Sequence, residues 1–122
     1  MSTRRVARME GLIQNEVSRL LLLKIKDSRL KSIIVTGVKV TPDLKRARVY
    51  YGLLDAQADR TGAAQALERA SGFFRREIAQ VLKLRFAPEI GFEYDQALDY
   101  GRRMDAVFED LEAHRKPEEH GT

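Results

Sequence analysis

The residues with the clearest chemical meaning are arginines spaced along one side of a predicted helix. Arg4, Arg8 and Arg19 lie opposite an apolar stripe whose members recur every three or four positions over residues 5–24. The stripe consists of Val6, Met9, Ile13, Val17 and Leu20. Guanidinium groups bind phosphates through paired hydrogen bonds, so a row of them suits a nucleic-acid backbone. A helix whose polar side is simply hydrated explains the same pattern equally well.

A second group of basic side chains alternates along residues 45–54. Lys45 starts the segment, and Arg46, Arg48 and Tyr50 then point to one face of a predicted strand. The opposite face is apolar and consists of Ala47, Val49, Tyr51 and Leu53. Arginine beside tyrosine is common on nucleic-acid-binding surfaces. Charge on an exposed strand also prevents pairing with other sheets, so both interpretations stay open.

The third candidate lies inside a helical pattern over residues 63–84. The spacing of its apolar residues continues through Ala70, Ser71 and Gly72, which predicts one long helix. Glycine in a helix interior costs about 1 kcal/mol relative to alanine, and Ser71 could cap a new helix, so a break or kink is the second interpretation. After a break, free amide groups, with Arg75 and Arg76 in the next turn, would form an anion site.

Catalytic and metal-binding chemistry has little support in this sequence. There is no cysteine, and both histidines, His114 and His120, lie near the C-terminal end. The only local carboxylate cluster is Glu93, Asp95 and Asp99, which is expected to be hydrated rather than to form a metal site or an acid-base pair. No nucleotide-binding glycine motif occurs. We therefore expect no enzyme, no catalytic residue, no metal and no cofactor.

Charge is distributed unevenly along the 122 residues. Residues 1–54 hold 12 basic and 4 acidic side chains, residues 55–85 hold 6 and 4, and residues 86–122 hold 4 and 10. The net charge of +4 is therefore the sum of +8, +2 and −6. Such a distribution favours binding of a polyanion on one side of the molecule. The longest apolar run, residues 20–23, is too short to span a membrane.

The remaining patterns place these residues in one α+β domain of residues 1–113. Ile34, Thr36, Val38 and Val40 alternate with Ile33, Val35, Gly37 and Lys39 as a strand, and residues 41–44 form a turn before the second strand. A third strand with one acidic face begins after Pro88, and a short closing helix follows. The closing helix contains Met104, Val107, Phe108 and Leu111. Leu12 and Leu22 lie outside the first apolar stripe and predict a wider buried face. Residues 114–122 are expected to be a flexible acidic tail.

The predicted order of helix, strand, strand, helix, kink, helix and strand resembles a single type II KH-like domain with a three-stranded sheet. Such domains bind single-stranded nucleic acid through a Gly-x-x-Gly turn, which is absent here. With Ala70-Ser71-Gly72 as an Ala-x-Gly kink at that place, the chain resembles the ribosome-binding factor A family. Further matching fragments extend over about a hundred positions. They are Arg5-Val6, Asp27-Ser28-Arg29-Leu30, Val40-Thr41-Pro42-Asp43-Leu44, Ala47-Arg48-Val49-Tyr50, Leu84-Arg85-Phe86-Ala87-Pro88-Glu89-Ile90-Gly91-Phe92, Asp95 and Tyr100-Gly101. Ser28 stands where the family usually has proline, and the C-terminal tail is shorter than in many members.

The resemblance implies a monomeric, non-enzymatic factor of the bacterial cytoplasm, a location that the absence of a transit peptide also favours. It would bind the free 30S subunit and not the 70S ribosome, contact 16S rRNA near its 5′-terminal helix, and support late subunit maturation and 16S processing, with a role in cold adaptation. No membrane or small-molecule substrate is expected. The helix kink carries over as Ala70, Ser71 and Gly72. The expected RNA-binding residues are Arg4, Arg8, Arg19, Lys45, Arg46, Arg48, Ser71, Arg75 and Arg76. A generic KH-like single-stranded RNA binder and a protein-interaction module are the alternatives.

Overall fold

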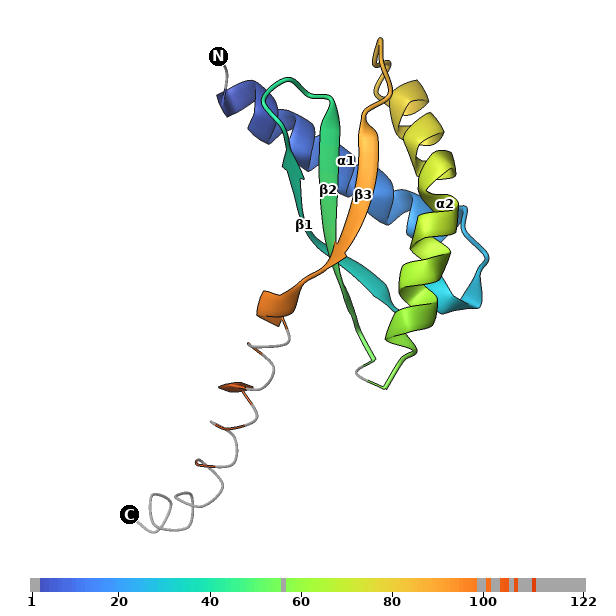
Figure 1. Ribbon diagram of the computed structural model, residues 1–122, viewed down its shortest axis with the longest axis vertical. Coiled ribbons are helices and arrows are strands. Elements are labelled where there is room, and N and C mark those ends of the chain that lie inside the picture. Colours follow the sequence, from blue (N-terminus) through green and yellow to red (C-terminus); the bar gives the residue numbers. More distant parts are fainter. Residues whose placement is uncertain are drawn as a thin grey trace.

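In the part of the chain that the structure describes, two long helices and a short 3-10 helix pack with a three-stranded mixed sheet (Figure 1). The computed structural model describes residues 3–55, 57–98, 101, 104, 105, 107 and 111. The elements in chain order are α1 (Thr3–Leu23), η1 (Ser28–Leu30), β1 (Ile33–Val40), β2 (Arg46–Leu53), α2 (Arg60–Val81) and β3 (Glu89–Tyr94). The predicted α+β class and three-stranded sheet are confirmed.

The sheet has the order β1-β2-β3, and its two strand pairs differ in direction. β1 and β2 are antiparallel and are joined by a tight turn, whereas β2 and β3 are parallel. A parallel pair needs a long crossover connection, which α2 supplies. In Figure 1, α1 crosses behind the sheet and α2 runs along its β3 edge. The face of the sheet that points away from α1 carries the exposed side chains of Arg46 and Arg48.

The core lies between the sheet and the two helices. Its largest fully buried side chains come from α1, β2 and α2. They are Ile13, Val17, Leu20, Val49, Leu67, Phe74 and Ile78. The apolar stripe of α1 and the inner face of β2 are therefore confirmed. Leu22 is 81% exposed and Leu12 is 37% exposed, so the wider buried face predicted for α1 is wrong.

β1 departs from the predicted strict alternation. Val35 pairs with Tyr51 and Gly37 pairs with Tyr50, so Thr36 is an extra residue in a β-bulge. A one-residue insertion moves every later side chain to the other face, because side chains alternate with a period of two. Ile33 is therefore buried before the bulge, and Val38 is buried after it. Ile33 and Val35 before the bulge, and Val38 and Val40 after it, lie in the core or pack against it.

Of the two interpretations of residues 63–84, the single long helix is confirmed and the break is wrong, because α2 continues through Gly72 without interruption. The hydroxyl of Ser71 donates a hydrogen bond to the carbonyl of Glu68, at 2.8 Å, instead of capping a new helix. Leu67, Phe74 and Ile78 lie on both sides of Gly72 and are all fully buried. Burying three large side chains on one stripe outweighs the cost of one glycine.

The C-terminal end of α2 turns sharply and leads into β3. The amide of Lys83 donates a hydrogen bond to the carbonyl of Gln80, and the amide of Leu84 donates one to the carbonyl of Ala79. These two hydrogen bonds form a Schellman motif. Lys83 adopts the left-handed conformation that this motif requires, with φ of 55°. Two hydrogen bonds from Arg75 to the carbonyl of Ala87 then hold the following loop against α2.

The predicted closing helix and tail lie in the C-terminal part of the chain, which the structure describes only in part. Described residues of the predicted closing helix, namely 104, 107 and 111, are helical, but Val107 and Leu111 are exposed rather than packed in the core. Phe108, Asp99 and the predicted tail, residues 114–122, lie outside the described residues, and the domain boundary stays a prediction. Within the part of the chain that the structure describes, no helix is long and apolar enough to cross a membrane.

Candidate nucleic-acid interface

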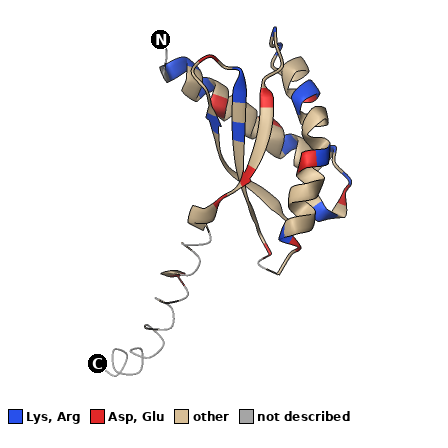
Figure 2. Cartoon of the chain, viewed as in Figure 1, with Lys and Arg blue, Asp and Glu red and all other residues tan. Residues whose placement is uncertain are grey.

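The outer face of β1 and β2 carries three exposed cations. Lys39 on β1 lies directly opposite Arg48 on β2, and Arg46 lies two residues before Arg48 on the same face. Like charges placed opposite each other on neighbouring strands repel. Figure 2 shows Lys and Arg on one end of β1 and β2, with acidic residues on the neighbouring β3. We name Lys39, Arg46 and Arg48 the strand cations.

Acidic side chains of β3 compensate this charge only in part. Glu93 approaches Arg48 to 3.6 Å, but both side chains are more than half exposed, so the ion pair contributes little stability. A hydrogen bond with Tyr50, and then the charge of Glu93, raise the pKa of Arg48 above its ordinary value. The guanidinium is permanently charged, as arginine side chains in proteins are. A shallow groove of about 430 Å³ runs over this face, between Lys39, Arg46 and Glu89.

A larger groove of about 730 Å³ lies beyond the β1–β2 turn, and we name it the hairpin groove. Four cations line it, and they come from α1, the turn, α2 and the loop before β3 respectively. They are Arg5, Lys45, Arg75 and Arg85. Two carboxylates, Asp43 and Glu89, also line it. Asp43 already accepts hydrogen bonds from the Thr41 hydroxyl and the Lys45 amide, and these lower its pKa.

The two grooves meet at the edge formed by the hairpin and the start of β3. Val40 and Glu89 line both grooves, and Lys45 and Arg46 are neighbours in sequence. The strand cations and the four cations of the hairpin groove therefore form one continuous surface, which we name the basic band. Arrays of this kind bind the phosphates of nucleic acids through charge alone, without reading the sequence.

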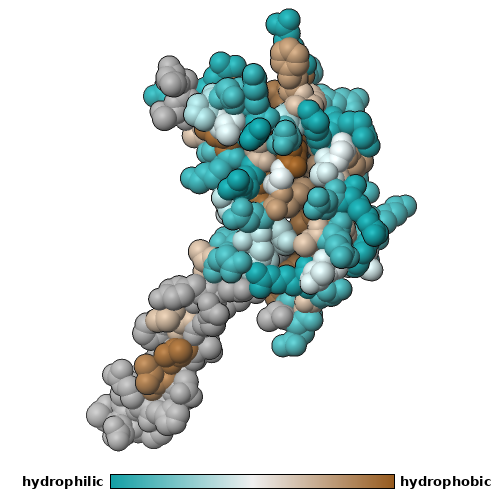
Figure 3. Space-filling view, viewed as in Figure 1, coloured by the Kyte–Doolittle hydropathy of each residue, from teal (hydrophilic) through white to brown (hydrophobic). Residues whose placement is uncertain are grey.

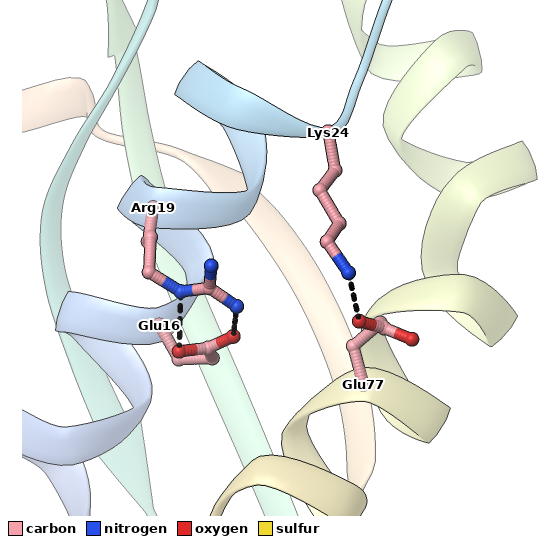
Figure 4. Close-up of polar contacts among 4 residues, drawn as sticks. All are labelled: Glu16, Arg19, Lys24 and Glu77. Carbon is pink, nitrogen blue, oxygen red and sulfur yellow. Dashed lines mark hydrogen bonds and ion pairs between the residues drawn. The ribbon is translucent and has the colours of Figure 1, made fainter.

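The predicted row of arginines on α1 does not present three equivalent side chains to a ligand. Arg4 and Arg8 are exposed near the start of the helix. Arg19 instead forms two hydrogen bonds with Glu16, of 3.0 and 2.6 Å, and Glu16 is only 6% exposed (Figure 4). Hydrogen bonding to Glu16 raises the pKa of Arg19. The guanidinium of Arg19 therefore compensates a nearly buried carboxylate, which reduces what it offers a phosphate. Figure 4 also shows the Lys24–Glu77 contact of 3.4 Å, which joins the residue that follows α1 to α2.

The middle of α2 does not form the predicted amide site. Because the helix is continuous, the amides after Gly72 are not at a helix N-terminus, and this correction removes the proposed anion-binding dipole. A groove of about 260 Å³ passes Ser71, but its lining includes Glu68 and no cation among the described residues. Arg76 is exposed nearby, whereas Arg75 is hydrogen-bonded to Ala87. Contacts of Ala70, Ser71 and Gly72 with RNA stay a prediction.

Asp95 also differs from its prediction as a hydrated acid. It is partly buried and accepts a hydrogen bond of 2.6 Å from the hydroxyl of Thr36. Its other carboxylate oxygen accepts the amides of Ala97 and Leu98, so it caps the turn that follows β3. Among the described residues, no group of three or more potential ligands could hold a metal ion.

Sequence patterns did not select four further residues of this surface. Lys39 could be recognised only through its strand register opposite Arg48. Arg5, Arg85 and Phe86 are distant in sequence and meet only where α1 approaches the loop before β3. Only the structure shows that Phe86, next to Arg85, is 76% exposed.

A small α+β domain with a basic, grooved surface is typical of the class of polyanion-binding proteins. A crystal structure of ribosome-binding factor A from Thermus thermophilus shares the fold, with a TM-score of 0.65 and 22% identity over 73% of this chain and 94% of that one. A solution structure of a Thermotoga maritima protein described as a putative ribosome-binding factor A also has a TM-score of 0.65. It is 32% identical over 79% of this chain and 92% of that one.

The sequence comparisons define the family. The family model described as ribosome-binding factor A matches residues 5–108, and the chain belongs to this family. Ribosome-binding factor A of Geobacter sulfurreducens is 42% identical over 103 residues, which cover 84% of this chain and 87% of the relative. The protein of Lacticaseibacillus casei is 42% identical over 108 residues, covering 88% and 92%. The expectation that the chain is not an enzyme is confirmed by its membership in this family.

Proposed function

We propose that the protein binds the free 30S ribosomal subunit, and not the 70S ribosome, and assists the late maturation of that subunit. Family membership supports this proposal. A further support is a homology model of the Thermus thermophilus ribosome-binding factor A, which was fitted into a map of a 30S complex. It has a TM-score of 0.62 with 24% identity, over 75% of this chain and 96% of that one. The single observation in this chain that carries the proposal is the basic band.

The chemistry of the basic band favours an RNA phosphate backbone as its target. Its cations project from several elements around one edge of the domain, so successive phosphates can be neutralised at once. Glu89 and Glu93 place negative charge along the neighbouring strand. This charge restricts RNA to one side, and residues 86–122 together hold 10 of the 18 acidic side chains of the chain.

We further propose a site on 16S rRNA as the target and 16S processing as the step that the protein supports. The protein acts as a monomer in the cytoplasm, contacts 16S rRNA near its 5′-terminal helix and supports 16S processing, with its largest effect in the cold. Residues 1–113 form the KH-like ribosome-binding domain. The proposed phosphate contacts are Arg4, Arg8, Lys39, Lys45, Arg46, Arg48 and Arg76. Arg19, which is paired with the carboxylate of Glu16, and Ser71 contribute less, and Arg75 contributes a fixed positive charge at the hairpin groove.

Sedimentation in a sucrose gradient tests this function. Purified protein is mixed with 30S subunits, with 50S subunits or with 70S ribosomes, and the fractions are probed for the protein. We expect co-sedimentation with the free 30S subunit alone. Equal amounts on 30S and 70S particles would overturn the proposal. A higher affinity for a short single-stranded RNA than for 30S subunits would instead indicate a generic RNA-binding protein.

A further inference from the structure

The hairpin groove combines a basic rim with an apolar interior and an exposed aromatic ring. We propose that it holds one unpaired nucleotide of an RNA strand, with the base stacked on Phe86 and the flanking phosphates bound by the surrounding cations. This inference deepens the proposed function, because it rests on rRNA as the target and assigns a local structure to part of it. It gives the basic band a site for bases as well as for phosphates.

Phe86 is the first support. The ring is 76% exposed at the loop before β3, where an isolated aromatic side chain gains nothing from contact with water. Figure 3 shows apolar surface directly below the hydrophilic tip of this loop. The guanidinium carbon of Arg85 lies 5.5 Å from the centre of the ring, so the side of the ring that faces Arg85 is partly covered. A base stacked on the ring would find a cation beside it.

The groove beside this ring has the size and lining of a ligand site. Its volume of about 730 Å³ lies within the range of about 300–1,000 Å³ that is common for pockets enclosing small ligands. Apolar side chains from α1, β1, the hairpin turn and the loop form its interior. They are Met9, Ile13, Val40, Leu44, Leu84 and Pro88. A planar base needs such walls, because its faces are apolar and its edges are polar.

The charges around the groove favour a nucleotide over an apolar peptide. Four cations and two carboxylates line it, and one of those carboxylates, Asp43, is already bound within the turn. Arg75 is held in place by the carbonyl of Ala87, which positions its charge without neutralising it. An RNA strand with one splayed base supplies an aromatic surface and adjacent phosphates together. A paired base in a duplex cannot reach the ring.

A fluorescence experiment tests this site. The chain contains no tryptophan, so Phe86→Trp places a single indole on the proposed stacking position, and excitation at the red edge of indole absorption avoids the four tyrosines. The probe is a short single-stranded RNA of mixed sequence. We expect the RNA to quench the fluorescence of the introduced indole strongly and the matching duplex to leave it unchanged. Leu22→Trp is the matched control, because Leu22 is similarly exposed but lies on α1 outside the basic band. Equal quenching in the two variants would overturn the proposal.

Binding affinities give a second readout. Phe86→Leu keeps an apolar side chain at an exposed position and removes only the ring, so the fold is preserved. We expect about tenfold weaker binding of the single-stranded RNA by this variant, and near wild-type binding by Phe86→Tyr. Wild-type affinity of Phe86→Leu would overturn the inference. If Phe86→Leu weakened 30S binding but not RNA binding, the groove would hold a ribosomal protein, which also overturns it.

These readouts are separate from the test of the proposed function. Co-sedimentation of the wild-type protein with 30S subunits tests that function and does not depend on Phe86. Loss of the stacking effect with intact 30S binding therefore overturns only the nucleotide site. Strong quenching by single-stranded RNA without any 30S binding supports the nucleotide site and overturns the ribosomal function.

Discussion

The hydroxyl of Thr36 donates a hydrogen bond of 2.6 Å to the carboxylate of Asp95, and this contact joins the two outer strands across β2. Thr36 is the bulge residue of β1, and Asp95 directly follows β3. The amide of Asp95 donates to the carbonyl of Tyr51 on β2, at 2.7 Å. Thus one aspartate links all three strands at the end of the sheet. The bulge is therefore a structural feature that places a hydroxyl where the chain leaves β3.

Replacing that hydroxyl should destabilise the domain. Thr36→Val keeps the shape of the side chain but leaves a carboxylate oxygen of Asp95 without its partner. We expect a loss of about 2 kcal/mol in the free energy of unfolding, measured by urea denaturation, because a hydrogen bond to a charged group is lost. Thr61→Val, at an exposed position in the first turn of α2, is the control. Equal unfolding midpoints for the two variants would contradict this role of Thr36.

Asp27 should give the stability a dependence on acid pH. Its carboxylate accepts hydrogen bonds from the side chain and the amide of Arg29, which lower its pKa from 3.8 to about 2. A pKa lowered by folding stabilises the folded state above the unfolded value, and this contribution is lost as the pH falls from about 4 toward 2. We expect Asp27→Asn to be less stable at pH 7 and to lose less stability over that acid range.

Urea unfolding midpoints at several pH values measure this difference. Asp105→Asn removes one negative charge at an exposed position and serves as the control. A profile of Asp27→Asn parallel to that of the wild type would show that Asp27 does not contribute to the acid dependence.

Lys83 offers a stabilising substitution. Its φ of 55° lies in the left-handed region, which costs a side chain with a Cβ atom about 1 kcal/mol and costs glycine almost nothing. Lys83→Gly should therefore raise the free energy of unfolding by about 1 kcal/mol, and thermal denaturation measures the gain. Lys31→Gly, at a position with an ordinary negative φ of −69°, should destabilise instead. A loss of stability in Lys83→Gly would show that its lysine side chain matters more than its backbone.

Gly72→Ala distinguishes a helical role from a contact role. The new methyl group would meet only the flexible end of Arg76, at 3.4 Å, so α2 can accept it. We expect a gain of about 1 kcal/mol in stability and unchanged 30S affinity, because no free amides lie at this position. Circular dichroism during thermal unfolding and 30S sedimentation provide the two readouts. Weaker 30S binding by the more stable variant would contradict this expectation. It would indicate that Ala70, Ser71 and Gly72 contact the subunit.

The sequence predicts correctly those features that depend on the residues of a single helix or strand. The stripe of α1 and the alternation of β2 follow from local periodicity, and both strand cations on β2 were found that way. The bulge at Thr36 left no signal, because residues on both faces of β1 are largely apolar. The break at Gly72 was wrong because a propensity of about 1 kcal/mol is smaller than the burial of Leu67 and Phe74 around it.

The candidate site was harder to predict because it is assembled from distant segments. Arg5, Lys45 and Arg85 line one groove although eighty residues of chain separate the first from the last. No local pattern contains that information. The pairing of Arg19 was different, because Glu16 lies three residues earlier and such pairs are neighbours on a helix. That signal was present in the sequence.

The central claim is that the basic band carries the affinity for the 30S subunit. The variant with Lys39→Gln, Arg46→Gln and Arg48→Gln removes the strand cations. A matched variant with Lys26→Gln, Lys31→Gln and Arg69→Gln removes three exposed cations outside the band. The dissociation constant for purified 30S subunits is measured at several salt concentrations, after urea unfolding has confirmed that both variants fold.

We expect the strand-cation variant to bind much more weakly than the wild type and the matched variant to bind nearly as well. The slope of log affinity against log salt should become shallower by about 2 to 3 in the strand-cation variant alone, since each lost phosphate contact removes roughly 0.7 to 0.9. Equal affinities and equal slopes in the two variants would contradict the claim.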